Sequence, residues 1–291
     1  MEDVFELQDD IVTRIAATVG PEITLAEIER AQGKRPETFD TWDHFLQAKA
    51  AYNRMTKEDL DIAISHLENA IEIESDFANA YALLALCYTN IAMYGWRQPV
   101  RAAYEEAQNF AEKAVRMASS SPEANHALAF VLSMTGQAQK AIMIARRAIE
   151  LNPNFAEAHV ILGFALVLCG DLEGAMAACH KAERSNPRDT RESWLYDTLG
   201  HTYFFFGEYE KAIEVSEKQL HQERNLVGAY VTLACAHAQL GHQQEAKQYI
   251  GQLIKHVPRY SLRAVRKNPM FVDPELVSNL IESLELAGLP E

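Results

Sequence analysis

The sequence has 291 residues, of which 48% are hydrophobic, and a formal net charge of −14 at pH 7. This apolar content is enough to bury a continuous core, which argues against a disordered chain. The acidic balance argues against a nucleic-acid partner, because phosphates require clustered Lys and Arg side chains. No apolar run reaches about 18 residues, and the chain opens with Met1-Glu2-Asp3. We therefore expect neither a membrane span nor a signal peptide, and a cytoplasmic location.

The first 35 residues form a segment of their own. Apolar residues at helical spacing predict a helix over residues 3–19, which Gly20-Pro21 ends. A shorter apolar stretch covers residues 22–31, and a second break follows at residues 33–36. We expect the segment 1–35 either to cap the structure that follows it or to pack against another copy of the chain.

A 34-residue period of small residues and prolines dominates the rest of the chain. Ala129, Ala141, Ala148 and Pro153 return 34 positions later as Gly163, Ala175, Ala182 and Pro187. After a three-residue slip, the spacing continues through Gly200, Ala212, Ala234, Ala246 and Pro258. A period of about 34 residues built from paired helices resembles the tetratricopeptide repeat. The small residues let neighbouring helices approach closely, and the proline turns the chain into the next repeat.

The period predicts an all-α fold, a right-handed tetratricopeptide-repeat solenoid of about six helical hairpins. The first hairpin pairs helices near 41–53 and 59–73, and the second carries roughly ten extra residues in its turn. Residues 36–260 form the array, and residues 261–291 form terminal capping helices, one of them opened by Asp273-Pro274 and ended by Gly288. The repeats are expected at 40–77, 78–121, 122–155, 156–189, 193–226 and 227–260.

The four cysteines fall inside predicted helices. They are Cys87, Cys169, Cys179 and Cys235. We expect free, buried thiols in a reducing compartment, rather than contact between Cys169 and Cys179 across one hairpin. The usual nucleotide-binding, zinc-protease and serine-hydrolase motifs do not occur in the sequence, and its ten histidines show no recurring ligand spacing. We expect no enzyme activity, no metal site and no cofactor.

Several short stretches outside the repeat pattern resemble one bacterial family. They are residues 5–11, 40–43, 55–60, 273–274 and 287–291. In this family of signalling proteins, a class III adenylate/guanylate cyclase or winged-helix DNA-binding domain precedes a TolB-like segment and a tetratricopeptide array. The resemblance implies that residues 1–35 belong to the end of the TolB-like segment and that the array regulates an output domain. The sequence contains neither the cyclase nor the winged helix, so it implies no catalytic residue here.

The repeat family lines a concave groove with the first helix of each hairpin. By resemblance, the partner-binding groove residues are His126, Phe130, Val160, Phe164, Val167, Trp194, Asp197, His201, Phe204, Phe205 and Val231. This stripe is apolar and aromatic, and two interpretations stay open: a partly exposed groove, or packing between repeats. The sequence predicts a module that binds a partner protein or peptide. The alternative is a homodimerisation module; an unrecognised enzyme and a helical-repeat RNA binder are less favoured.

Overall fold

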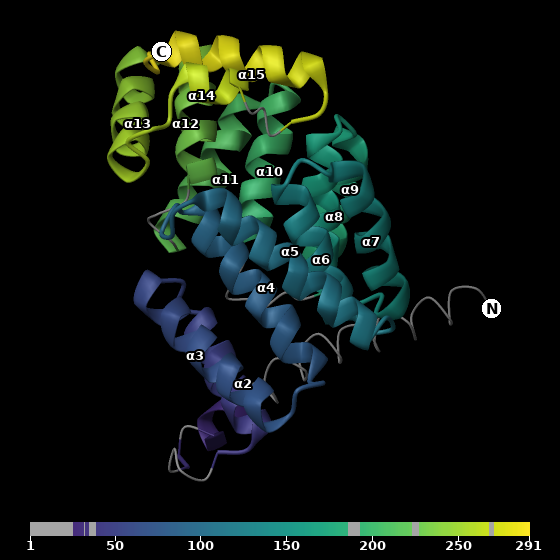
Figure 1. Ribbon diagram of the computed structural model, residues 1–291. Coiled ribbons are helices and arrows are strands. Elements are labelled where there is room, and N and C mark those ends of the chain that lie inside the picture. The colour runs from purple at the N-terminus through teal and green to yellow at the C-terminus, as the bar shows by residue number, and fades with distance from the viewer. Residues whose placement is uncertain (1–25, 32, 35–38, 186–192, 223–226, 268–270) are drawn as a thin grey trace, which may run out of the picture. The chain divides into compact units, whose positions relative to one another are not determined.

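The computed structural model describes residues 26–31, 33–34, 39–185, 193–222, 227–267 and 271–291. Within these ranges, all regular secondary structure is helical, so the predicted all-α class is confirmed (Figure 1). Residues 26–31 form a short helix. The helices that follow are α2 (Thr41–Tyr52), α3 (Lys57–Ile73), α4 (Ala78–Met93), α5 (Val100–Met117), α6 (Pro122–Met134), α7 (Ala138–Leu151), α8 (Ala156–Leu168), α9 (Leu172–Ser185), α10 (Ser193–Phe205), α11 (Tyr209–Gln222), α12 (Val227–Gln239), α13 (Gln243–His256), α14 (Leu262–Lys267) and α15 (Pro274–Ala287).

The described residues divide into two units. The first takes residues up to 161 together with 181–185, and the second takes 162–180 and the residues from 193 onward. In the first unit α2 packs on α3, α4 on α5, and α6 on α7. In the second, α10 packs on α11 and α12 on α13. Each predicted repeat range thus holds two consecutive helices.

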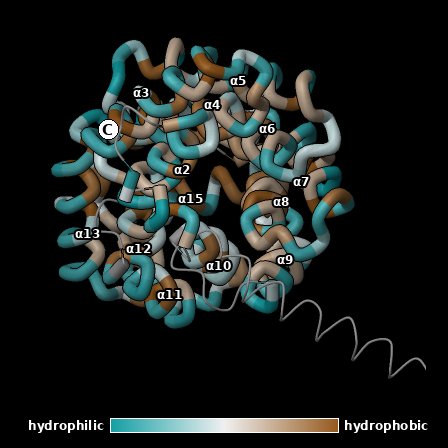
Figure 2. Tube along the Cα trace, turned by 90° about the horizontal axis from the view of Figure 1, so that it is seen from below, coloured by the Kyte–Doolittle hydropathy of each residue, from teal (hydrophilic) through white to brown (hydrophobic). Residues whose placement is uncertain are grey.

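The two helices of a hairpin differ in how much of their surface is apolar. In α4 twelve of 16 residues are buried, whereas in α5 only four of 18 are, all of them alanines. The buried residues of α7 are likewise four alanines. Figure 2 shows the same contrast, with brown and tan along α8 and recurrent teal along α13. The first helix is therefore covered on most sides, and the second presents an alanine stripe to it and a polar face to water.

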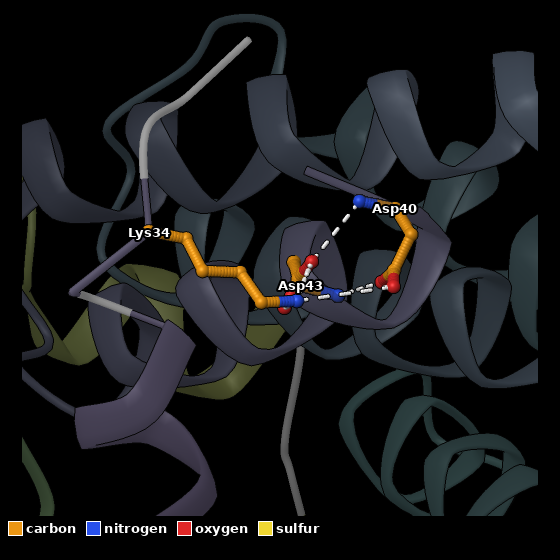
Figure 3. A network of polar contacts seen from close by, with 3 residues as sticks. All are labelled: Lys34, Asp40 and Asp43. Carbon is orange, nitrogen blue, oxygen red and sulfur yellow. Dashed lines mark hydrogen bonds and ion pairs between the residues drawn. The ribbon is translucent and has the colours of Figure 1, made fainter. Parts of the chain in front are cut away.

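A buried carboxylate anchors the chain in front of the first hairpin. Asp43, which is fully buried, closes a capping box with Asp40 at the start of α2. The Lys34 ammonium binds both Asp43 oxygens at 2.6 and 2.5 Å (Figure 3). The Asp43 pKa is lowered: its burial opposes the charged form, and the Lys34 and Asp40 contacts outweigh that effect. Ile28 of the short helix 26–31 also packs against Leu46 of α2.

The predicted capping signals of the last helix are confirmed. The Asp273 side chain accepts from the backbone N–H groups of Glu275 and Leu276, and Pro274 occupies the first turn of α15. Gly288 follows the helix with φ +89°, a left-handed conformation that glycine adopts without strain. The predicted helix at 3–19 lies outside the described residues.

The cysteines are free, as predicted, but one of them is placed differently. Cys87, Cys179 and Cys235 are buried, whereas Cys169 is only half-buried, so its predicted burial is wrong. Cys169 lies in the turn that follows Leu168, the last residue of α8, rather than inside a helix as predicted. The extended turn between α4 and α5 is also more structured than a simple surface loop, because Trp96 stacks on Tyr94 and packs against the core.

Candidate interaction surface

Eight of the eleven predicted groove residues are buried in the described chain. They are Phe130, Val160, Phe164, Val167, Asp197, His201, Phe204 and Val231. The remaining three, His126, Trp194 and Phe205, are half-buried. All three lie on first helices, α6 and α10, and each contacts a second aromatic ring. The assignment of the eleven to a partner groove stays a prediction, and these three offer the accessible part of that set.

The half-buried rings sit on buried or partly buried supports. The His126 and Phe155 ring centroids are 5.3 Å apart. Trp194 meets Phe164 edge-on at 6.0 Å, and Phe164 is 1% exposed. A fixed support reduces the rotamer freedom that an exposed aromatic side chain loses when it is bound.

Gly163 lies where α8, α9 and α10 approach one another closely. A Cβ atom at Gly163 of α8 would lie 3.2 Å from the Cys179 sulfur of α9 and 3.4 Å from a methyl carbon of Thr198 on α10. A methyl group at this position would already be in tight contact with α9 and would touch α10, so a larger side chain would overpack the site. The predicted role of the small residue, close helix approach, is therefore observed at Gly163.

Asp197 belongs to a buried polar network rather than to an open surface. Its Oδ1 accepts from Gln219 Nε2 at 3.2 Å, and a Cβ at Gly228 would collide with the same oxygen. His201 Nδ1 lies 2.8 Å from the Asp197 carbonyl oxygen, so this nitrogen carries the proton and donates it. The Gln219–Asp197 hydrogen bond links α11 to α10, and Gly228 of α12 lies close to the same carboxylate. Gln219 occupies a repeat position where alanine is expected, and that irregularity was the available sequence signal for it.

Sequence reasoning missed the segment that covers His201 and Phe205. The Phe271 ring lies 4.9 Å from the Phe205 ring and 5.9 Å from the His201 ring, and Phe271 is 3% exposed. The next residue, Val272, donates its backbone N–H to the Leu168 carbonyl at 2.7 Å. The apolar residues just before Asp273-Pro274 were the signal, but their spacing gave no partner.

Burial changes the acid–base behaviour of several cysteine and histidine side chains. Burial raises the pKa of the Cys87 and Cys235 thiols strongly, so both stay protonated and are poor nucleophiles. Burial lowers the pKa of His159 and of His44, whose Nδ1 lies 3.0 Å from His66 Nδ1. In the described part of the chain, no three His, Cys, Asp or Glu side chains come together as a metal site, and no helix could cross a membrane.

Comparison with known protein families identifies the repeat type. A tetratricopeptide-repeat model matches residues 195–222 and 227–255. The model for subunit 3 of the anaphase-promoting complex, or cyclosome, matches residues 101–182. Among solved structures, the Cut9–Hcn1 hetero-tetramer of APC/C is similar over 91% of this chain and 48% of that chain, with a TM-score of 0.61 and 14% identity. The fold is a tetratricopeptide-repeat solenoid.

Two further comparisons cover very different shares of the matched proteins. PilW, a type IV pilus biogenesis factor, is 17% identical with a TM-score of 0.51, covering 77% of this chain and 98% of PilW. Putative adenylate cyclase 3 of Rhizobium meliloti (strain 1021) is 27% identical over 144 residues. That match covers 48% of this chain but only 24% of the relative's length. It supports the predicted resemblance for the repeat region; the TolB-like and winged-helix parts stay predictions.

Proposed function

We propose that this chain is a protein-interaction module that binds a peptide or helix of a partner protein along the first helices of its hairpins. The observation that carries the proposal is the pair of half-buried Trp194 and Phe205 side chains on α10 of the second unit. Aromatic side chains of this kind, rigid and partly exposed, are enriched where proteins bind one another. The repeat architecture favours binding over catalysis.

We further propose that the module is the regulatory part of a bacterial signalling protein linked to a cyclase or to transcription. The 144-residue match to a putative adenylate cyclase supports this role. Reading the genomic frame upstream of the Met1 codon tests it. An in-frame cyclase or winged-helix domain is the expected result, and an in-frame domain of unrelated chemistry would contradict the link.

A displayed peptide library tests the binding function on the full chain. We expect one family of related peptides to be enriched and to bind at micromolar affinity. Trp194→Ala should weaken binding of that family by at least tenfold, because Trp194 is a half-buried ring on a first helix. Phe206→Ala is the matched control: Phe206 is 42% exposed and follows α10, so its loss should leave affinity within twofold.

Two outcomes would contradict the proposal. The first is a library that yields no peptide family above the background of an unrelated helical protein. The second is a peptide family whose affinity falls equally with Trp194→Ala and Phe206→Ala. Circular dichroism of both variants at the assay temperature separates lost binding from lost folding.

A further inference from the structure

The C-terminal segment, residues 271–291, lies along the ends of three successive first helices in the second unit. Val272 donates its backbone N–H to Leu168 at the end of α8. Phe271 packs on Phe205 at the end of α10. Gln239 at the end of α12 donates from Nε2 to Ser283 Oγ at 2.7 Å. The start of the segment therefore contacts the ends of α10 and α8, and α15 lies across α12 (Figure 1).

Phe271 is the aromatic anchor of this arrangement. Its ring meets Phe205 nearly perpendicularly, at 79°, and also contacts His201. Both residues belong to the predicted groove. An aromatic side chain from a distant part of the sequence thus occupies positions assigned to a partner, in the edge-to-face geometry that aromatic pairs prefer.

The backbone at the entry of α15 fits closely against the turn after α8. Gly170 has φ +84°, and a Cβ there would lie 2.8 Å from the Asp273 carboxylate. The turn can accept the capping aspartate at this distance only because residue 170 has no side chain. The extended Asp273 caps the start of α15, and Val272 beside it forms a backbone hydrogen bond to Leu168. Contacts of these kinds also hold a bound peptide in place.

The C-terminal segment and the helices beside it also carry charges of opposite sign, as a ligand and its binding site often do. Residues 271–291 contain five acidic residues and no Lys or Arg, whereas residues 243–267 contain six Lys or Arg and one acidic residue, in a chain of net charge −14. Arg266 of α14 binds Glu285 and both oxygens of Glu291, the latter at 2.7 and 2.8 Å. Because these ion pairs are exposed, they contribute little binding energy; they mainly favour an acidic ligand over a basic one.

We propose that residues 271–291 are an intramolecular ligand of the partner-binding site, which a partner displaces. This inference rests on the proposed function. The partner segment it specifies is acidic, with an aromatic residue directly before an amphipathic helix whose apolar residues repeat as Leu276, Leu280 and Leu284 do. Displacing the segment uncovers the Phe271 contact on α10 and the basic side chains of α13 and α14 together.

Binding of a synthetic peptide with the sequence of residues 271–291 tests the proposal on the full chain. A tethered segment competes at roughly millimolar effective concentration, so the wild-type chain should bind the peptide weakly. Phe271→Ala loosens the chain's own segment and should raise peptide affinity at least tenfold; Phe206→Ala should not. A peptide with Gln and Asn in place of the five acidic residues should bind Phe271→Ala at least tenfold more weakly. Equal affinity of wild type and Phe271→Ala, or of the acidic and amide peptides, would overturn the proposal.

Hydrogen exchange on the wild-type chain gives a second test that needs no variant. An isotope-labelled peptide of the same sequence, added at several millimolar, should speed exchange of the chain's own Val272 and α15 amides more than tenfold while α8 stays protected. Unchanged exchange in α15 would overturn the proposal even if Phe271→Ala failed to fold. If instead a library peptide binds wild type and Phe271→Ala equally well, the binding function stands and the intramolecular ligand fails.

Discussion

At the scale of single residues, Phe164 is a predicted groove residue whose burial indicates a role in the core. It belongs to the predicted groove, yet it is 1% exposed and supports Trp194. We predict that Phe164→Ala lowers the free energy of unfolding by about 3–5 kcal/mol, because the lost ring leaves a cavity. Urea denaturation measures this change, with Phe206→Ala as the exposed control. A loss below about 1 kcal/mol would show that Phe164 is not core.

Gly228 and Asp197 form a pair whose contact leaves no room for a side chain on residue 228. A Cβ at Gly228 would collide with Asp197 Oδ1. We predict that Gly228→Ala destabilises the chain by about 1–3 kcal/mol and that adding Asp197→Ala recovers part of the loss. A double-mutant cycle by urea denaturation measures the coupling. Strictly additive losses would mean that the two residues do not constrain each other.

The His44–His66 contact predicts how stability responds to acid. Burial lowers the pKa of both imidazoles from the ordinary 6.5, and the His44 charge lowers that of His66 further; Asp43 and Asp40 partly oppose the shift at His44. The unfolded chain therefore binds protons more readily, so stability is complete above pH 6.5 and falls as the pH drops below it. We predict a lower melting temperature at pH 5.5 than at pH 7.5.

His66→Phe isolates this pair from other histidines with lowered pKa, such as His159 and His237. The variant keeps an aromatic ring beside His44 but cannot take the second proton. The difference in melting temperature between pH 5.5 and 7.5 should shrink in His66→Phe. An unchanged difference would assign the acid sensitivity to groups elsewhere in the chain.

The sequence predicts the role of a recurring repeat position better than it predicts which other side chains a residue contacts. The period located Gly163, and the close contacts of Gly163 agree with the predicted small-residue role. It could not tell that Asp197 faces Gln219 or that Phe271 covers Phe205, because Gln219 departs from the alanine expected at its repeat position and Phe271 lies outside the repeats. A 34-residue pattern describes what recurs, and these contacts occur once.

At the scale of elements, the start of α2 depends on the residues in front of it. Lys34 is about one-third exposed and binds the buried Asp43 carboxylate. We predict that Lys34→Met lowers the free energy of unfolding by roughly 1–3 kcal/mol, because it leaves a buried carboxylate without its cation. Thermal or urea denaturation measures the loss. Lys57→Met, at the exposed first residue of α3, is the matched control and should change stability by less than about 0.5 kcal/mol. Equal effects of the two substitutions would contradict the anchoring role of Lys34.

Element boundaries followed the sequence closely where caps and periodicity agreed. The predicted helices at 41–53 and 59–73 are observed as α2, Thr41–Tyr52, and α3, Lys57–Ile73. The earlier start of α3 comes from Thr56, whose side chain accepts from the Asp59 N–H as an N-cap. The path of the chain into α15 was not predictable, since it depends on the tertiary contacts of Phe271 rather than on a local signal.

At the scale of the whole molecule, the proposed function rests on a difference between first and second helices. The first helix α4 is mostly buried, whereas the second helices α5 and α7 bury only alanines. The proposed binding surface uses first helices, and the second helices are expected to face water.

The central claim is that partners bind along the first helices, and hydrogen exchange of the full chain with and without a bound peptide from the displayed library tests it most directly. The account predicts slower exchange in α10 and in neighbouring first helices, and little change in α7, α11 and α13. Protection confined to those second helices, or none at saturating peptide, would contradict it.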